Sequence, residues 1–435
     1  MTQLLIKAAN LVTGGAADDQ GLPAGRQDIL IADGRYADPA EATAEATVID
    51  ADGLLAVPGL IDLHTHLREP GREDAETVAS GTAAAARGGF AAVLAMANTV
   101  PVTDTAEAAR NVAELGRRAE NAQVFPIGAV TKGLQGAELA EIGLMARTGV
   151  RMFSDDGNCV HDARLMRRAL EYVRSFDAVI AQHAQDPRLA GKDACCHEGE
   201  VSGRLGLVGW PAVAEASVIA RDVELTKLTG SRLHVCHVST AESVDVLRWA
   251  KKRGVDVTAE VTPHHLLLTT SAVEGYDPTY KVNPPLRPDE DVAALRAALA
   301  DGTIDAVATD HAPHARHDKE HAFGDAAFGM VGLETALAVV IETMINNDAM
   351  SWDDCVRRTS IAPARIARLD PSSGLGSTPA IGAPANLTVV DPDRRALVDA
   401  ADSASLSRNN PYHGLELPDP IMITISAGSV RFQRS

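Results

Sequence analysis

The stretch Leu60-Ile-Asp-Leu-His-Thr-His-Leu-Arg-Glu-Pro-Gly71 joins an apolar run to two histidines that stand one residue apart. Side chains alternate between the two faces of a β-strand, so His64 and His66 point the same way. Arg68 shares that face if the strand continues, and it then places a positive charge beside two imidazoles. A lone His-x-His pair is common, but this stretch suggests a metal site with an anion pocket beside it.

The chain around this stretch predicts an α/β fold. Between Pro58 and about Thr378, short apolar runs alternate with longer helical patterns, which is typical of repeated βα units and a parallel sheet. Eight runs are candidate strands, and eight is the strand count of a TIM (β/α)8 barrel. The expected strands are 60–66, 90–97, 123–131, 150–156, 178–184, 232–238, 256–262 and 305–311.

The two ends of the chain have a different texture, with short strand patterns separated by turns such as Asp33-Gly34 and Asp52-Gly53. Two β-rich ends of similar length can pair with each other. We therefore expect a small composite β-sandwich domain made of residues 1–56 and 379–435, attached to a barrel domain at 57–378.

Composition limits the partners. Lysine plus arginine number 40 against 59 aspartate plus glutamate, and the net charge of −19 argues against nucleic acid or an anionic membrane. No run approaches the ~18 apolar residues of a membrane span, and the first residues lack the layout of a signal peptide. The 5 cysteines form no C-x-x-C pattern, which fits a reducing compartment. We expect a cytoplasmic protein that acts on a small molecule.

Polar residues stand where five of the expected strands end, and barrel enzymes carry their chemistry at these ends. Each of them alone has an ordinary explanation, as a hydrogen-bonded histidine or a turn. Closing a barrel does not require so many buried ionisable groups, and their uncompensated burial is costly. The segments are His64-Thr-His66, Ser154-Asp-Asp-Gly157, Gln182-His-Ala184, Cys236-His-Val-Ser239 and Thr309-Asp-His311.

A metal centre would compensate these charges. Imidazoles mixed with carboxylates suit Zn²⁺ and other first-row divalent ions. Four imidazoles and two carboxylates are enough to bind two metal ions if one carboxylate bridges them. Two such ions about 3.5–4 Å apart can hold a bridging hydroxide and polarise a carbonyl. The pattern therefore predicts amide hydrolysis.

The same residues resemble a known family. Their order along the strands resembles the amidohydrolase superfamily, and four long motifs resemble class I dihydroorotase in particular, over nearly the whole chain. This resemblance implies the reversible interconversion of N-carbamoyl-L-aspartate and L-dihydroorotate in de novo pyrimidine biosynthesis. The motifs are Asp62-Leu-His-Thr-His-Leu-Arg-Glu-Pro-Gly71, Met96-Ala-Asn-Thr-Val-Pro101, Lys281-Val-Asn-Pro-Pro-Leu-Arg287 and Ala308-Thr-Asp-His-Ala-Pro-His314.

The resemblance also implies roles for residues, with one or two Zn²⁺ per subunit. Asp156 is expected to bridge the metals, with Asp155 as a competitor, and the strand end holds no lysine for that role. Asp310 is expected to be the proton shuttle. The implied metal ligands are His64, His66 and Asp310 for the first ion and His183 and His237 for the second. The implied substrate contacts are Arg68, Asn98 and His314 for a carboxylate, and Asn283 with the backbone at Phe328 and Gly329 for the ring.

Two alternatives remain open at this stage. One is another cyclic-amide hydrolase such as an allantoinase; the other is an inactive dihydroorotase-like scaffold for aspartate transcarbamoylase. The family also leads us to expect a homo-oligomer and leaves open a complex with aspartate transcarbamoylase. His264 and His265, after Thr262-Pro263, are expected to shape the exit of the seventh strand.

Overall fold

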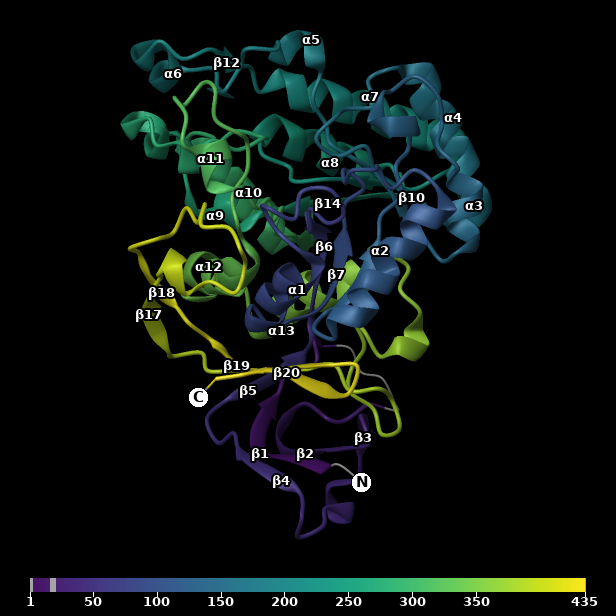
Figure 1. Ribbon diagram of the computed structural model, residues 1–435, viewed down its shortest axis with the longest axis vertical. Coiled ribbons are helices and arrows are strands. Elements are labelled where there is room, and N and C mark those ends of the chain that lie inside the picture. Colours follow the sequence, from purple (N-terminus) through teal and green to yellow (C-terminus); the bar gives the residue numbers. More distant parts are fainter. Residues whose placement is uncertain (1–2, 16–20, 435) are drawn as a thin grey trace.

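The computed structural model describes residues 3–15 and 21–434, which form an α/β body with a β-sheet at one end (Figure 1). Eight short strands of the body fall inside the eight predicted ranges, although each is shorter than its range. They are β6 Leu60–Thr65, β7 Phe90–Ala95, β8 Gln123–Pro126, β9 Met152–Phe153, β10 Val179–Gln182, β13 Leu233–Val235, β14 Val257–Val261 and β15 Ala306–Val307.

These strands are parallel and follow one another in chain order. One sheet has the order β6-β7-β8 and another the order β9-β10-β13-β14-β15. Single parallel bridges join the two sheets at both sides, between Gly128 and Phe153 and between Thr65 and His311. The carboxyl ends of all eight strands therefore meet on one side of the body.

Helices separate the strands, and several begin at a capping residue that the sequence supplies. The side chains of Thr105 and Thr240, for example, each accept a hydrogen bond from a backbone N–H in the first turn. Small apolar residues pack these helices on the strands, as in the buried face of α1. The longer helices are α1 Val78–Arg87, α2 Ala106–Ala119, α3 Ile142–Arg147, α4 Ala163–Val173, α7 Val213–Thr229, α8 Ala241–Lys252 and α10 Asp289–Asp301.

Short elements follow the carboxyl ends of several strands, and α5, α6 and β12 lie at the top of Figure 1. The excursion after β10 contains α5 Pro187–Ala190, β11 Cys196–His197, α6 Glu200–Leu205 and β12 Gly209–Trp210. The segments after β14 and β15 contain α9 Pro263–Leu267, η4 Thr270–Gly275, η5 Pro278–Tyr280 and α11 Arg316–Lys319. The last part of the body holds α12 Ala336–Val340, α13 Trp352–Val356 and α14 Ala362–Ile366.

Strands from the two ends of the chain pair into one sheet. Its order is β20-β19-β16-β5-β1-β2-β3, with β4 beside β1, and the antiparallel pair β5 and β16 joins the two ends. A separate hairpin of β17 Arg395–Leu397 and β18 Glu416–Pro418 contacts α12. The strands of the sheet are β1 Gln3–Leu11, β2 Gly25–Ala32, β3 Arg35–Ala37, β4 Thr47–Asp50, β5 Leu55–Pro58, β16 Leu387–Val390, β19 Ile421–Ser426 and β20 Ser429–Gln433.

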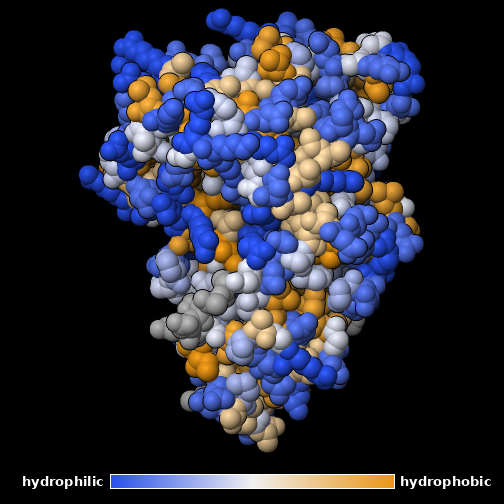
Figure 2. Space-filling model, turned by 180° about the vertical axis from the view of Figure 1, so that it is seen from behind, coloured by the Kyte–Doolittle hydropathy of each residue, from blue (hydrophilic) through white to orange (hydrophobic). Residues whose placement is uncertain are grey.

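On the face seen in Figure 2, hydrophilic side chains predominate and apolar groups are scattered among them. Within the described ranges, no helix has the length and apolar character needed to cross a membrane.

Candidate active site

Asp156 lies at the centre of a buried cluster at the strand ends. Its carboxylate oxygens lie 3.2 Å from His64 Nε2, 3.3 Å from His66 Nε2, 3.3 Å from His237 Nε2 and 3.5 Å from His183 Nδ1. All five side chains are buried. Residues from four separate strand ends thus meet around one carboxylate.

Asp310 adds a second carboxylate from the end of β15. Its Oδ1 lies 3.1 Å from His66 Nε2 and 3.5 Å from His64 Nε2. The structure therefore brings together all six residues for which metal ligation was predicted.

The donor atoms suit two cations that share Asp156. Two groups of ligand atoms each lie within 4.8 Å of one another, His64 with His66 and Asp156, and Asp156 with His183 and His237. His64 Nε2 is buried and has no hydrogen-bond partner among the described residues, and His183 Nδ1 lies only 2.9 Å from His237 Nε2. Imidazole nitrogens that converge around a carboxylate are the arrangement that a divalent ion satisfies.

Three of the imidazoles are oriented by an oxygen on their outer side. His64 Nδ1 lies 2.8 Å from Glu260 Oε1, His66 Nδ1 lies 2.9 Å from Asn98 Oδ1, and His183 Nε2 lies 2.9 Å from Gln185 Oε1. An outer N–H that donates to such an oxygen leaves the inner nitrogen free of its proton and able to bind a cation. These outer hydrogen bonds therefore favour the tautomers in which the inner nitrogens can bind a cation.

Glu260 is the functional residue that the sequence analysis missed. It is buried in β14, and its other oxygen lies 3.0 Å from His234 Nε2. His234 Nδ1 in turn lies 2.9 Å from Thr258 Oγ1, so His234 supports Glu260 from inside the body. A glutamate within an otherwise apolar strand pattern was the available signal.

Electrostatics inside the cluster favour charged carboxylates. Burial opposes ionisation of Asp156 and Asp310, but the neighbouring histidines, His64 foremost, hold the pKa of both carboxyls below the usual range. Burial also disfavours a charged His64, but Asp156 and then Asp310 raise its pKa well above the ordinary value. The cluster thus attracts positive charge.

Asp155 has a different environment from Asp156. Its Oδ1 accepts hydrogen bonds from Val130 N at 2.8 Å and Thr131 N at 2.9 Å, and its Oδ2 accepts one from Thr131 Oγ1. Asp155 therefore holds the loop after β8, whereas Asp156 faces the four imidazoles.

The adjacent histidines His264 and His265 differ from each other. His265 is bonded on both sides, to Thr262 Oγ1 at 2.7 Å and to Pro285 O at 3.2 Å, which is the shaping role predicted for it. His264 is also buried, but its Nε2 has no hydrogen-bond partner among the described residues.

Arg68 lies beside the cluster and lacks a charge partner. Its Nε donates to Pro313 O at 3.0 Å, and its NH2 lies 3.4 Å from His314 Nε2. His314 Nε2 donates to Phe328 O at 2.7 Å, so that nitrogen is not available as an acceptor for Arg68. No carboxylate of the described chain forms an ion pair with Arg68, and its guanidinium can therefore receive an anion.

The other predicted substrate contacts lie nearby. Gly329 N donates to Lys281 O at 2.9 Å, which places the segment at Phe328 next to the segment that contains Asn283. Neither the side chain of Asn283 nor the amide of Phe328 makes a hydrogen bond within the described part of the chain. Asn98 is partly engaged, because its oxygen orients His66.

Three residues of this region have left-handed backbone angles that non-glycine residues rarely adopt. The φ values are +60° for Arg68, +29° for His237 and +47° for Asp310. Such strain is typical of functional sites, where the surrounding structure imposes it.

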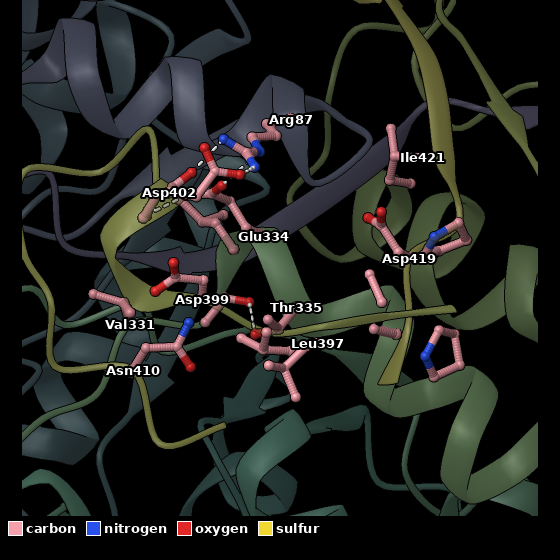
Figure 3. Close-up of a pocket in the computed structure, with 18 of the residues that line it drawn as sticks. Arg87, Val331, Glu334, Thr335, Leu397, Asp399, Asp402, Asn410, Asp419 and Ile421 are labelled. Atoms are coloured by element: carbon pink, nitrogen blue, oxygen red, sulfur yellow. Dashed lines mark hydrogen bonds and ion pairs between the residues drawn. The ribbon is translucent and has the colours of Figure 1, made fainter. Parts of the chain in front are cut away.

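A separate cavity of about 140 Å³ lies between the body and the C-terminal segment (Figure 3). Arg87 contributes to its lining and pairs there with Glu334 at 3.0 Å and with Asp402. Arg434 pairs with Asp419 in the same lining, and none of the six clustered residues lines the cavity.

Comparison with solved structures identifies proteins of the same fold. The fold matches L-hydantoinase (dihydropyrimidinase) from Arthrobacter aurescens with a TM-score of 0.84 at 24% identity, covering 100% of this chain and 97% of the other. Dihydropyrimidinase from Brevibacillus agri also matches at 0.84, with 21% identity and coverage of 99% and 95%. The chain therefore shares the mixed α/β fold of these two structures, and its cluster is a candidate metal centre.

Sequence comparison gives the family. The model "Dihydro-orotase-like" matches residues 53–243. A dihydroorotase of Streptomyces coelicolor is 56% identical over 98% of this chain and 97% of its own length, and one of Mycobacterium tuberculosis is 52% identical over 93% and 94%. The chain belongs to the dihydroorotase family.

Proposed function

We propose that the protein is an active dihydroorotase, which interconverts N-carbamoyl-L-aspartate and L-dihydroorotate in pyrimidine biosynthesis. The observation that carries this proposal is Arg68, an arginine without an acidic partner beside a complete imidazole and carboxylate cluster. Both forms of the substrate carry a carboxylate, and a guanidinium can bind it bidentately.

The cluster would hold one or two Zn²⁺, with His64, His66 and Asp310 at one ion, His183 and His237 at the other, and Asp156 between them. Bound divalent ions would polarise the ring carbonyl and make water a stronger nucleophile near neutral pH. Asp156 is preferred over Asp155 as the shared ligand because Asp155 already accepts hydrogen bonds from Val130 and Thr131.

The protein side chains would divide the remaining work. Arg68, with Asn98 and His314, would bind the carboxylate, and burial together with the charge of Arg68 lowers the pKa of His314 to about 3, so this imidazole is neutral. Asn283 and the backbone of Phe328 and Gly329 would hold the ring amide groups. Asp310 would accept a proton from the attacking water and deliver it to the departing ring nitrogen. In the synthetic direction the proton would return by the same route.

We further propose that the eight parallel strands form a TIM (β/α)8 barrel within residues 57–378. The parallel bridges at Gly128 and at Thr65 support this closure. The composite sheet of both ends would be the β-sandwich domain of residues 1–56 and 379–435. We also propose a cytoplasmic homo-oligomer, with association with aspartate transcarbamoylase as an open extension.

The alternatives are less well supported. The relatives given above, at 56% and 52% identity over nearly the whole chain, are dihydroorotases, and this similarity favours dihydroorotase over allantoinase. An inactive scaffold is expected to lose metal ligands, and all six candidate ligands are present in the cluster.

A substrate panel with metal analysis tests the proposal. Purified protein loaded with Zn²⁺ should hydrolyse L-dihydroorotate and cyclise N-carbamoyl-L-aspartate, with little activity on allantoin or unsubstituted hydantoin. Metal content of one or two ions per chain should accompany the activity. Loaded protein that leaves dihydroorotate intact, or that prefers a ring without a carboxylate, would contradict it.

A further inference from the structure

Lys319 is buried at the end of α11 with its ammonium among main-chain carbonyl groups. Its Nζ lies 2.9 Å from Ala327 O, 3.1 Å from Gly329 O and 3.3 Å from Lys281 O. An ammonium group has three donors and no acceptor. The number of acceptors around Lys319 therefore equals the number of hydrogens that the charged side chain can donate.

An ion pair does not explain this position. Within the described residues, no carboxylate oxygen lies within 4.0 Å of Lys319 Nζ, although only 9% of the residue is exposed. Burial, and then the charge of Lys281, lowers the pKa of Lys319 to about 7, whereas the more distant Asp277 acts in the opposite direction. Burying an amine without an ion pair costs free energy. The contacts with the three carbonyl groups are therefore what keeps Lys319 in this position.

These carbonyls flank the free amide of Phe328. Phe328 O is occupied by His314 Nε2 at 2.7 Å, and Gly329 O also receives Asn409 Nδ2 at 3.1 Å. Three consecutive carbonyls, those of 327, 328 and 329, are thus held by side chains. The Phe328 N–H between them is left without a protein acceptor in the described chain.

The third carbonyl, Lys281 O, connects segment 327–329 to the segment that contains Asn283. Lys281 O accepts both Lys319 Nζ and Gly329 N, the latter at 2.9 Å, and Lys281 precedes the unbonded Asn283 by two residues. No side chain larger than hydrogen fits at Gly329, where φ is +141° and an added Cβ would lie 2.7 Å from Ala312 Cβ. The two segments therefore have one close, fixed arrangement with Lys319 at their junction.

We infer that Lys319 is a positioning residue for the substrate ring: it locks segment 327–329 against Lys281 and so sets the distance between the Phe328 N–H and the Asn283 amide. The inference rests on the proposed function for the identity of the ring. Lys319 itself does not touch the substrate, and its effect passes through these two donors.

The main test is Lys319→Met, which keeps an unbranched side chain only one atom shorter and removes the donors. We expect the KM for dihydroorotate to rise about 10- to 100-fold, as for the loss of a buried hydrogen-bond network, with kcat within about threefold of wild type. Metal content should stay unchanged. Lys319→Arg, which retains donors, should recover part of the KM.

Arg316→Met is the matched control on the same helix. Its side chain is 87% exposed and pairs only with Glu320, so its loss should leave KM unchanged. Should Lys319→Met fail to fold, Lys319→Gln keeps two amide donors and should give an intermediate KM.

The inference is overturned if a folded Lys319→Met or Lys319→Gln protein has a KM within twofold of wild type. It is also overturned if thermal stability and metal content fall while KM stays constant, because that is the signature of a purely structural residue. Wild-type turnover of dihydroorotate tests the proposed function separately. If another cyclic amide is the substrate, the same KM ratios are measured with it, and if none is turned over, the Kd for dihydroorotate replaces KM.

Discussion

The two halves of the candidate active site treat charge in opposite ways. In the cluster of imidazoles and carboxylates, each imidazole faces the carboxylate of Asp156, and Asp310 adds a second negative charge. In the substrate half, Arg68 has no carboxylate within 4.0 Å among the described residues, whereas Lys281 and Lys319 already donate to main-chain carbonyls. Buried cations without a partner are costly unless a ligand compensates them. The first half is therefore built to receive cations, and the second to receive an anion.

The largest effect should follow from breaking the cation half at its shared residue. Asp156→Ala removes the one carboxylate that lies within 3.5 Å of all four imidazoles. We expect loss of bound metal and a fall in kcat/KM on the order of 10³-fold or more, because a catalytic metal ion lowers the activation free energy by several kcal/mol. Metal analysis and the dihydroorotate assay measure both.

Metal removal from the wild-type protein is the companion control. Dialysis against a chelator should abolish activity, and added Zn²⁺ should restore it in the wild type but not in Asp156→Ala. A variant that keeps both ions and full turnover would show that the four imidazoles do not need Asp156.

A somewhat smaller effect is expected from Asp310→Asn. The amide oxygen can still lie beside His66, but the side chain can no longer take up a proton at neutral pH. We expect kcat to fall about 10²- to 10⁴-fold, the usual contribution of a positioned acid or base, while metal content stays the same. Wild-type turnover in this variant would remove Asp310 as the proton carrier.

The anion half is tested by Arg68→Met. Losing charge-assisted hydrogen bonds to a carboxylate, each worth about 1.5–3 kcal/mol, should raise the KM for dihydroorotate roughly 100-fold with metal still bound. Arg72→Met is the control, because that arginine already pairs with Asp74 and Asp318. Equal KM values for the two variants would contradict a special role for Arg68.

The sequence predicts the cation half well because its signals are residue types at strand ends. Apolar runs located all eight strands, and the carboxyl ends of parallel strands must meet at one edge. The predicted range 150–156 shrinks to a strand of two residues, Met152–Phe153, because the chain after it turns into the site. That shortening does not move Asp156 away from the cluster.

The anion half is less visible in sequence, because it depends on backbone groups and on missing partners. The carbonyls that bind Lys319 belong to the main chain, so no residue type in the sequence indicates them. The lack of an acidic neighbour around Arg68 is a property of the folded chain. Glu260 was missed for a related reason. Its place inside β14 does not reveal that it reaches His64 of β6, a strand that does not pair with β14.

The smallest effect should come from Glu260→Gln, which separates the geometry of the cluster from its charge. The amide keeps the shape of the carboxylate and can still accept the hydrogen bond of His64 Nδ1, but it no longer makes that imidazole more basic. We expect metal affinity to fall about 10- to 100-fold, the usual effect of changing a residue that orients a ligand. Glu224→Gln, an exposed change of the same charge, should leave affinity unchanged in the same chelator competition. If Glu260→Gln binds metal as tightly as this control, the carboxylate serves only to pack His64 and His234, and the cation half would owe its charge to Asp156 and Asp310 alone.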